Sequence, residues 1–310
     1  MRTPFLPVPE PVAFTVFGVD IMWYAIMITT GIVMGTLLAY RRAPRYGIDP
    51  ERVLDMILYC VPASIVGART YYVIFEWDRY KNDLIQVFNI RGGGMAIHGA
   101  LIVALALGAY IVRRWKQKPF DWFDLFAPGI ALGQAIGRWG NYFNSEAHGG
   151  PTDLPWAIYA DGEFVHPTFL YESVWCLLLC IALVLYERKH GRSKFSGQIF
   201  CLYGFFYSLE RYFVEGLRTD SLWIGPFRQA QLISLGTMAA CAVLYFVLRK
   251  RAEKAAEGPA AEEDAEEPEA EEQASDEPAE TEEISAEPEE SPSADEPSAD
   301  EEPAQAEDLQ

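Results

Sequence analysis

One polar stretch stands out because it follows directly on an apolar segment. Residues 137–149 read GRWGNYFNSEAHG and hold Arg138, Asn141, Asn144 and Glu146. Lipid cannot solvate such groups, so polar and ionisable residues at membrane depth are costly and usually functional. The planar fork of an arginine binds two phosphate oxygens at once, which makes Arg138 a candidate phosphate ligand. The alternatives are an interfacial arginine against bulk lipid headgroups and asparagines that cap turns.

A second polar group lies on one predicted helix. Tyr207, Arg211 and Glu215 are spaced i, i+4 and i+8, so they share a helix face. Glu215 can pair with Arg211 and fix the orientation of its guanidinium group, whereas Glu210 points elsewhere. Arginines inside membrane segments are usually functional, and this favours a functional role for Arg211. A plain helix-end ion pair, with the arginine reaching toward the interface, is the alternative.

A histidine is the remaining candidate for proton transfer. His98 follows the glycine run 92–94 and is flanked by Gly99. An imidazole takes up or releases a proton near neutral pH, so His98 is a candidate general base. A packing histidine with satisfied hydrogen bonds is the alternative.

Seven apolar stretches have about the length that a helix needs to cross a bilayer, roughly 20 residues. In lipid the backbone must satisfy its own hydrogen bonds, so helices are expected, and the alternation of barrel strands is absent. The fourth stretch is the weakest, because it contains Asp121, Asp124 and Pro128. The predicted fold is an all-α integral membrane protein with seven transmembrane helices. The stretches are approximately 20–40, 54–75, 95–112, 120–137, 169–186, 198–214 and 230–248.

The basic residues predict the orientation of these helices. Of the 25 Lys and Arg residues, 16 fall in the predicted loops and tail junction of one side and seven on the other. Basic residues concentrate on the cytoplasmic side, so the N-terminus is expected outside and the C-terminus in the cytoplasm. The first stretch is too long for a signal peptide and lacks its flanking features.

With this orientation, nearly every unusual polar residue lies in the outer half of the membrane. The sequence therefore predicts one polar cavity that opens toward the outer leaflet or the outer water. The residues are Tyr24, Arg69, Glu76, His98, Arg138, Asn141, His166, Tyr171, Glu172, Tyr207, Arg211 and Glu215.

Charge divides the chain into two parts. Residues 252–310 hold 25 of the 44 acidic residues and one of the 25 basic ones, so they carry −24 and residues 1–251 carry +5. The second part has no aromatic residue and is rich in Ala, Pro, Ser and Glu. Such a composition cannot bury enough apolar surface to fold. We expect a membrane catalytic domain over 1–251 and a disordered acidic cytoplasmic tail over 252–310, whose removal leaves catalysis intact.

The polar stretch resembles the signature of the bacterial prolipoprotein diacylglyceryl transferases, G-R-x-G-N-F-x-N-x-E-x-x-G after a transmembrane helix, with Tyr142 in place of the usual Phe. Where that family usually reads H-G-G, this chain has Ala100 after His98-Gly99. The resemblance covers about residues 12–250. It also includes Trp23-Tyr24, Gly93-Gly94-Met95, His166-Pro167 with Leu170-Tyr171-Glu172, and Tyr207 through Arg218.

The resemblance implies a reaction. The family transfers the diacylglyceryl group of phosphatidylglycerol to the lipobox cysteine of a preprolipoprotein signal peptide. A thioether forms and glycerol 1-phosphate leaves. The implied location is the bacterial inner (cytoplasmic) membrane, and the implied partners are phosphatidylglycerol, lipobox peptides and membrane lipids. No cofactor, metal or nucleic-acid partner is expected.

This chemistry suggests a role for each candidate. The attacking sulfur must be a thiolate, whereas a free thiol is mostly protonated at neutral pH. Cations near the leaving phosphate stabilise its growing charge. The roles implied are Arg138 on the headgroup phosphate, Arg211 on the leaving group, Glu215 orienting Arg211, Tyr24 and Tyr207 as hydrogen-bond donors, His98 as thiol base, and Asn141, Asn144, Glu146 and Gly149 as phosphatidylglycerol ligands. Ionisation of the thiol by the arginines, without a dedicated base, is equally compatible with the sequence.

Three other classes of membrane protein are the alternatives. A transporter with an outer-facing polar cavity would place charges through the whole depth, often with repeats. Here the inner half is nearly bare and no repeat is evident. An intramembrane protease would need a G-x-S-x-G or H-E-x-x-H motif, and neither is present. A scaffold would not explain two intramembrane arginines.

Overall fold

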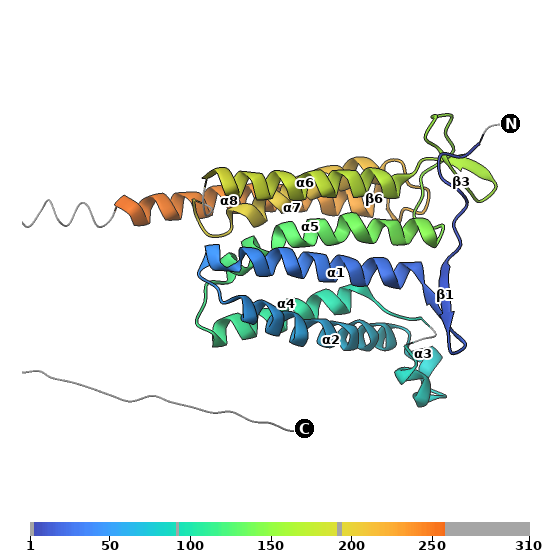
Figure 1. Ribbon diagram of the computed structural model, residues 1–310, viewed down its shortest axis with the longest axis horizontal. Helices are drawn as coiled ribbons and strands as arrows, with labels where there is room; N and C mark the ends of the chain where they lie inside the picture. The colour runs from blue at the N-terminus through green and yellow to red at the C-terminus, as the bar shows by residue number, and fades with distance from the viewer. Residues whose placement is uncertain (1–2, 91–92, 191–193, 258–310) are drawn as a thin grey trace, which may run out of the picture. The chain divides into compact units, whose positions relative to one another are not determined.

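The computed structural model describes residues 3–90, 93–190 and 194–257, and most of these residues are helical (Figure 1). Residues 258–310, which make up most of the predicted tail, lie outside the described residues. Short 3-10 turns, η1 (Ala43–Tyr46) and η2 (Leu84–Phe88), and one short helix, α3 (Trp77–Tyr80), lie between the long helices. The long helices are α1 (Trp23–Arg42), α2 (Pro50–Phe75), α4 (Ile97–Arg114), α5 (Pro119–Phe143), α6 (Thr168–His190), α7 (Gln198–Glu215) and α8 (Gln229–Glu257).

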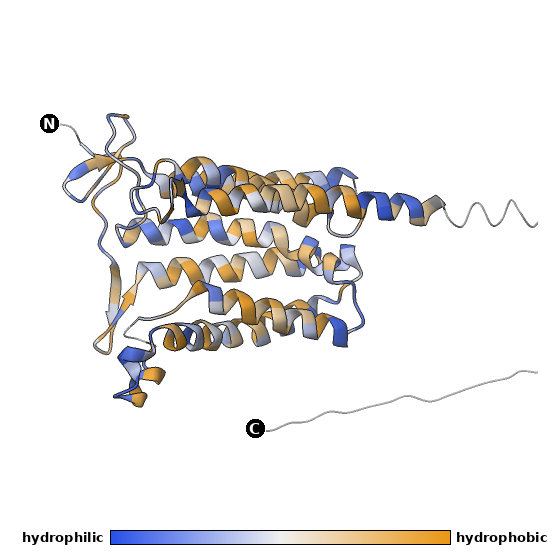
Figure 2. Ribbon diagram, turned by 180° about the vertical axis from the view of Figure 1, so that it is seen from behind, coloured by the Kyte–Doolittle hydropathy of each residue, from blue (hydrophilic) through white to orange (hydrophobic). Residues whose placement is uncertain are grey.

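Each predicted membrane segment coincides with one of these long helices. Five of them, α1, α2, α4, α6 and α8, are long and apolar enough to cross a membrane. Hydrophobic residues run along these helices and hydrophilic ones lie mainly near the ends (Figure 2), and many of the large apolar side chains are exposed. Such an apolar surface is unusual for a water-soluble protein, in which large exposed patches are rare. The chain is therefore a multi-pass membrane protein.

The charges in α5 are used to hold a neighbouring helix. Asp124 is fully buried and accepts hydrogen bonds from the backbone N–H groups of Gly197 and Phe200 at 2.8 Å each. Asp121 accepts a hydrogen bond from Ser196 Oγ at 2.6 Å. A carboxylate at a helix N-terminus accepts hydrogen bonds from free N–H groups, and its negative charge interacts favourably with the positive end of the helix dipole. These two carboxylates thus serve the start of α7, which explains their place in a largely apolar segment.

Glycines allow α1 and α5 to touch through their backbones. A Cβ added to Gly35 would lie 2.6 Å from the carbonyl oxygen of Gly129, and one added to Gly31 would lie 2.9 Å from that of Gly133. Small residues let helices approach closely in membranes, where packing and not the hydrophobic effect holds them together. The helices α1 and α5 are therefore packed closely together along this face.

Three two-stranded hairpins, which the sequence analysis does not predict, lie at one end of the helices (Figure 1). We call this the hairpin end. The loop before α4 is fixed there by Arg69, which donates to the backbone oxygens of Gln86, Val87, Gly93 and Gly94 at 2.5–2.8 Å. The hairpins are β1 (Val12–Val16) with β2 (Val19–Met22), β3 (Ile158–Ala160) with β4 (Glu163–Val165), and β5 (Trp223–Ile224) with β6 (Phe227–Arg228).

A buried ion pair closes the opposite end. Arg42 contacts Glu187 and also donates to the backbone oxygens of Asp124 and Leu125, the latter at 2.6 Å. Arg42 and Glu187 are 3% and 1% exposed. These contacts tie α1, α5 and α6 together at that end.

Candidate functional site

Two arginines share one buried carboxylate at the hairpin end. Arg138 of α5 contacts Oε2 of Glu172 through its Nε, and Arg211 of α7 donates from Nη1 to Oε1 of the same side chain at 3.1 Å. The other terminal nitrogen of Arg211 lies 2.5 Å from Glu215 Oε2. Glu172 and Glu215 are 1% and 3% exposed. Three helices thus form a buried ion cluster with two positive and two negative side chains.

One half of this cluster was predictable. The contact between Arg211 and Glu215 confirms the ion pair expected from their helical spacing. Glu172 is predicted from the sequence to lie in the same half of the molecule, without a role of its own. The sequence feature that could have identified Glu172 is a carboxylate near the start of an apolar helix. An ionisable residue in an apolar segment is also what identifies Arg138. Glu210 takes no part in these contacts, and its carboxylate oxygens are buried without a hydrogen-bond partner in the described residues.

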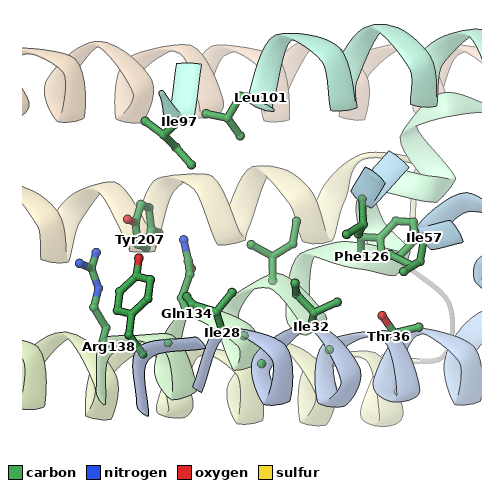
Figure 3. Close-up of a pocket in the computed structure, with 18 of the residues that line it drawn as sticks. Ile28, Ile32, Thr36, Ile57, Ile97, Leu101, Phe126, Gln134, Arg138 and Tyr207 are labelled. Carbon is green, nitrogen blue, oxygen red and sulfur yellow. The ribbon is translucent and has the colours of Figure 1, made fainter. Parts of the chain in front are cut away.

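A cavity of about 770 Å³ begins at Arg138. Arg138, Asn141 and Tyr207 line its polar end, while its other walls come from α1, α2, α4 and α5. Figure 3 shows Arg138 and Tyr207 at one end and Thr36, Ile57 and Phe126 at the other. The cavity is thus polar at the hairpin end and mostly apolar along the helices. A molecule with an anionic head and an apolar tail matches this gradient.

The terminal nitrogens of Arg138 are available to a ligand. Its Nε is the atom that contacts Glu172, and among the residues that the structure describes neither Nη1 nor Nη2 donates a hydrogen bond. Those two nitrogens form the fork with which arginine binds two oxygens of one phosphate. The carboxylate therefore holds the guanidinium from one edge and leaves its fork to the cavity.

Two tyrosines line the same cavity as Arg138. Tyr24, at the start of α1, lines the cavity and packs on Gly140, where an added Cβ would lie 2.8 Å from the tyrosine ring. The sequence analysis does not connect these two residues. Tyr207 stacks on Tyr203 with ring centroids 5.8 Å apart. Both predicted tyrosines therefore reach the same cavity as Arg138.

The loop after α5 presents a carboxylate beside Asn141. Glu146 Oε1 accepts hydrogen bonds from the Nδ2 atoms of Asn141, at 2.8 Å, and Asn144, at 3.4 Å. Ser145 and Ala147 on either side have positive φ angles of 53° and 58°. A residue in this conformation costs on the order of 1–3 kcal/mol and persists only when its surroundings fix it. The predicted group of Asn141, Asn144 and Glu146 is thus assembled by a constrained turn.

Gly149 joins three segments of the hairpin end. Its N–H donates to the carbonyl oxygen of His166 at 2.9 Å, and it forms a β-bridge with Arg218. A Cβ added here would lie 2.7 Å from His166 Cβ and 3.1 Å from the carbonyl oxygen of Leu217. Only glycine fits this junction, which couples the Glu146 loop to the ends of α6 and α7. The structure gives this predicted ligand a packing position, not an opening on the cavity.

Replacing Gly149 with alanine is expected to destabilise the protein by about 1–3 kcal/mol, because the crowded Cβ forces the junction apart. The activity of the site should fall with it, since the Glu146 loop shifts against the ion cluster. Thermal unfolding and turnover of Gly149→Ala check this. Gly150→Ala is the matched control, because the nearest atom to its added Cβ lies 3.7 Å away. Equal behaviour of the two variants would contradict the packing argument.

Two further arginines, Arg218 and Arg228, hold the loop after α7. Arg228 contacts the backbone oxygens of Glu215 and Arg218, the latter at 2.9 Å. Arg218 donates two hydrogen bonds to Asp220, at 2.6 and 2.8 Å, and these lower the pKa of the Asp220 carboxyl. The loop after α7 is therefore held by charged contacts of its own.

His98 lies apart from the ion cluster. It is an exposed residue of the first turn of α4, and its ring centroid is 6.0 Å from that of Tyr71. Its neighbours Ile97 and Leu101 line the cavity, but His98 does not. In the described residues it has no hydrogen bond to the arginines or glutamates of the cluster. Each of the other predicted catalytic side chains belongs to the ion cluster or lines the cavity. The role of His98 stays a prediction.

Comparison with known proteins gives the family. A profile described as prolipoprotein diacylglyceryl transferase matches residues 11–247. A phosphatidylglycerol–prolipoprotein diacylglyceryl transferase from Finegoldia magna is 49% identical over 80% of this chain and 99% of its own length. Enzymes of the same name from Clostridioides difficile (47% identity, 78% of this chain and 96% of theirs) and Clostridium kluyveri (44%, 79% and 99%) are similar. This chain belongs to the prolipoprotein diacylglyceryl transferase family.

Proposed function

We propose that this protein transfers the diacylglyceryl group of phosphatidylglycerol to the lipobox cysteine of a preprolipoprotein, forming a thioether and releasing glycerol 1-phosphate. Similar proteins carry that name over nearly their whole length. The observation that carries the proposal for this chain is the cavity, with the fork of Arg138 at its polar end and apolar helix walls beyond. An anionic phospholipid has this distribution of charge and apolar surface.

The reaction follows from the groups around that fork. Thiolate sulfur attacks the phosphate-bearing carbon of the diacylated glycerol, the S–C bond forms, and the C–O bond breaks with its electron pair moving to the oxygen that leaves with glycerol 1-phosphate. Arg138 binds the phosphate and Arg211 opposes the charge that develops on the leaving oxygen. Preorganised cations in a site without bulk water act mainly on the transition state, and removing one such group typically costs about 10²–10³-fold in rate.

The remaining residues orient this pair. Glu172 and Glu215 hold the guanidinium groups in place, so little reorganisation is needed when the lipid enters. Tyr24 and Tyr207 donate hydrogen bonds to phosphate or glycerol oxygens. Asn141, Asn144 and Glu146 bind the glycerol headgroup, whose hydroxyls match carboxylate and amide partners. His98 accepts the thiol proton, or the arginines lower the cost of ionisation without it.

The orientation belongs to the same proposal. The N-terminus and the hairpin end face the periplasm, the tail lies in the cytoplasm, and seven helices cross the inner membrane. The distribution of basic residues supports this. The helices α5 and α7 cross in spite of their charges, because Asp124, Arg138, Arg211 and Glu215 all have partners inside the protein. The site then opens where a secreted lipobox peptide leaves the membrane.

The test is a reconstituted transfer assay. Purified protein is incubated with phosphatidylglycerol vesicles and a lipobox peptide, and the diacylglyceryl thioether is followed by mass spectrometry. We expect product with phosphatidylglycerol, none with phosphatidylcholine, and none when the lipobox cysteine is replaced by serine. A folded wild-type protein that gives no product would overturn the enzyme and favour a transporter with an outer-facing cavity.

A further inference from the structure

One polar side chain of the cavity has no part in the mechanism above. Gln134 lies on α5 one turn before Arg138, and it lines the cavity between the arginine and the apolar walls (Figure 3). An amide in an apolar groove is costly unless its hydrogen-bonding groups find partners. The protein provides a partner for one end of the Gln134 amide, and the other end faces the cavity, where a ligand can bind it.

The protein fixes which end of the amide is which. Tyr203 donates its hydroxyl hydrogen bond to Gln134 Oε1 at 2.9 Å, and Cys176 Sγ lies 4.0 Å from the same oxygen. Both groups face this atom as donors, so Oε1 is the accepting end of the amide. The Nε2 group is therefore the end left for the cavity, and no hydrogen bond from it is present within the described ranges. Gln134 thus offers an oriented N–H donor in apolar surroundings.

The spacing of the two side chains matches a phospholipid. Four residues of α-helix advance about 6 Å, so the Gln134 backbone lies that far below the Arg138 backbone on the same face. In a diacyl phospholipid, five bonds separate phosphorus from the carbonyl carbon of the middle acyl ester. An extended chain advances roughly 1.2 Å per bond, as a peptide does over its three bonds per residue, which gives about 6 Å. A lipid phosphate on Arg138 therefore brings an ester carbonyl level with Gln134.

We propose that Gln134 donates a hydrogen bond to an acyl ester carbonyl of the lipid substrate and so sets the depth at which the lipid binds. The inference rests on the proposed function. Fixing the carbonyl and the phosphate at two points places the glycerol carbon between them for attack by the thiolate. The protein then selects diester lipids over ether-linked lipids, because an ether-linked lipid lacks the carbonyl oxygen. Gln134 is thus a specificity-determining and positioning residue.

The experiment is an internal competition. Vesicles hold equal amounts of diester and diether phosphatidylglycerol with a lipobox peptide, and mass spectrometry separates the two products in one reaction. The product ratio reports relative kcat/KM and does not depend on how much protein is folded. A neutral hydrogen bond is worth roughly 3- to 10-fold in binding, so the wild type should prefer the diester by about that factor. Gln134→Met should bring the ratio near one.

Two controls make the result specific. Ile130→Met changes another cavity residue of α5, one turn farther from Arg138, and should keep the wild-type ratio. Tyr203→Phe removes the hydroxyl that orients the amide and should give an intermediate ratio. A wild type without preference, or a Gln134→Met variant with the wild-type ratio, would overturn the assignment. Absence of product from both lipids in the wild type would instead overturn the proposed function.

Discussion

Replacement of Arg138 with alanine is expected to lower kcat/KM for diacylglyceryl transfer by about 10²–10³-fold or more. The side chain provides the only guanidinium fork that lines the cavity in the described part of the chain. Arg138→Lys should recover little of this loss, because an ammonium group cannot bind the Glu172 carboxylate along one edge and a phosphate along the other. The measurement is the mass-spectrometric transfer assay with purified variants at several lipid concentrations.

Arg79 is the matched control for this variant. It lies in α3 at the hairpin end, 66% of its side chain is exposed, and it pairs with Glu76 at 2.9 Å. Exposed ion pairs of this kind contribute about 0–1 kcal/mol, so Arg79→Ala should keep its turnover. Comparable rates for Arg138→Ala and Arg79→Ala would remove the phosphate-binding role from Arg138. A loss in Arg138→Ala that follows only from misfolding would show as an altered melting temperature and elution profile.

Hydropathy predicted the helices of this protein well, because lipid leaves the backbone few choices. The predicted spans 54–75 and 198–214 coincide closely with α2 and α7. Their ends were less predictable: α8 continues to Glu257, well past the apolar stretch, since charged residues can extend a helix into water. Among the predicted spans, the segment around Asp124 is the one that hydropathy supports least. Its charges were correctly identified as unusual, but their partners at the start of α7 depend on tertiary packing.

The site shows the same division between local and long-range information. The Arg211–Glu215 pair follows from spacing along one helix and was predicted. The bridge through Glu172 requires α5, α6 and α7 to meet, and no periodicity along the chain encodes that meeting. Gly149 was singled out through its place in a motif. Glycine is required there for a steric reason that comes from a distant segment, because the Cβ of His166 occupies the space that a side chain would need.

Neutralising Glu172 should have an effect of similar size on the ion cluster. In Glu172→Gln the two arginines keep Glu215 as the one carboxylate in direct contact with them among the described residues, and leaving a buried charge unpaired typically costs about 3–5 kcal/mol. We expect lower stability together with a large loss of turnover, because Arg138 and Arg211 repel each other and lose their shared orientation. Glu76→Gln is the control, since its carboxylate is 41% exposed and pairs only with Arg79 among the described residues.

The lipid should partly restore the stability of this variant, and that distinguishes an electrostatic role from a packing role. Phosphatidylglycerol brings an anionic phosphate to the same arginines, so it can supply the charge that Glu172→Gln lacks. Thermal unfolding in phosphatidylglycerol and in phosphatidylcholine measures the effect, because a ligand that binds the folded state raises its stability by an amount that grows with the logarithm of ligand concentration over Kd. The variant should gain more from the anionic lipid than the wild type gains. Equal gains, or full turnover in Glu172→Gln, would mean that the arginines do not depend on this carboxylate for their charge balance.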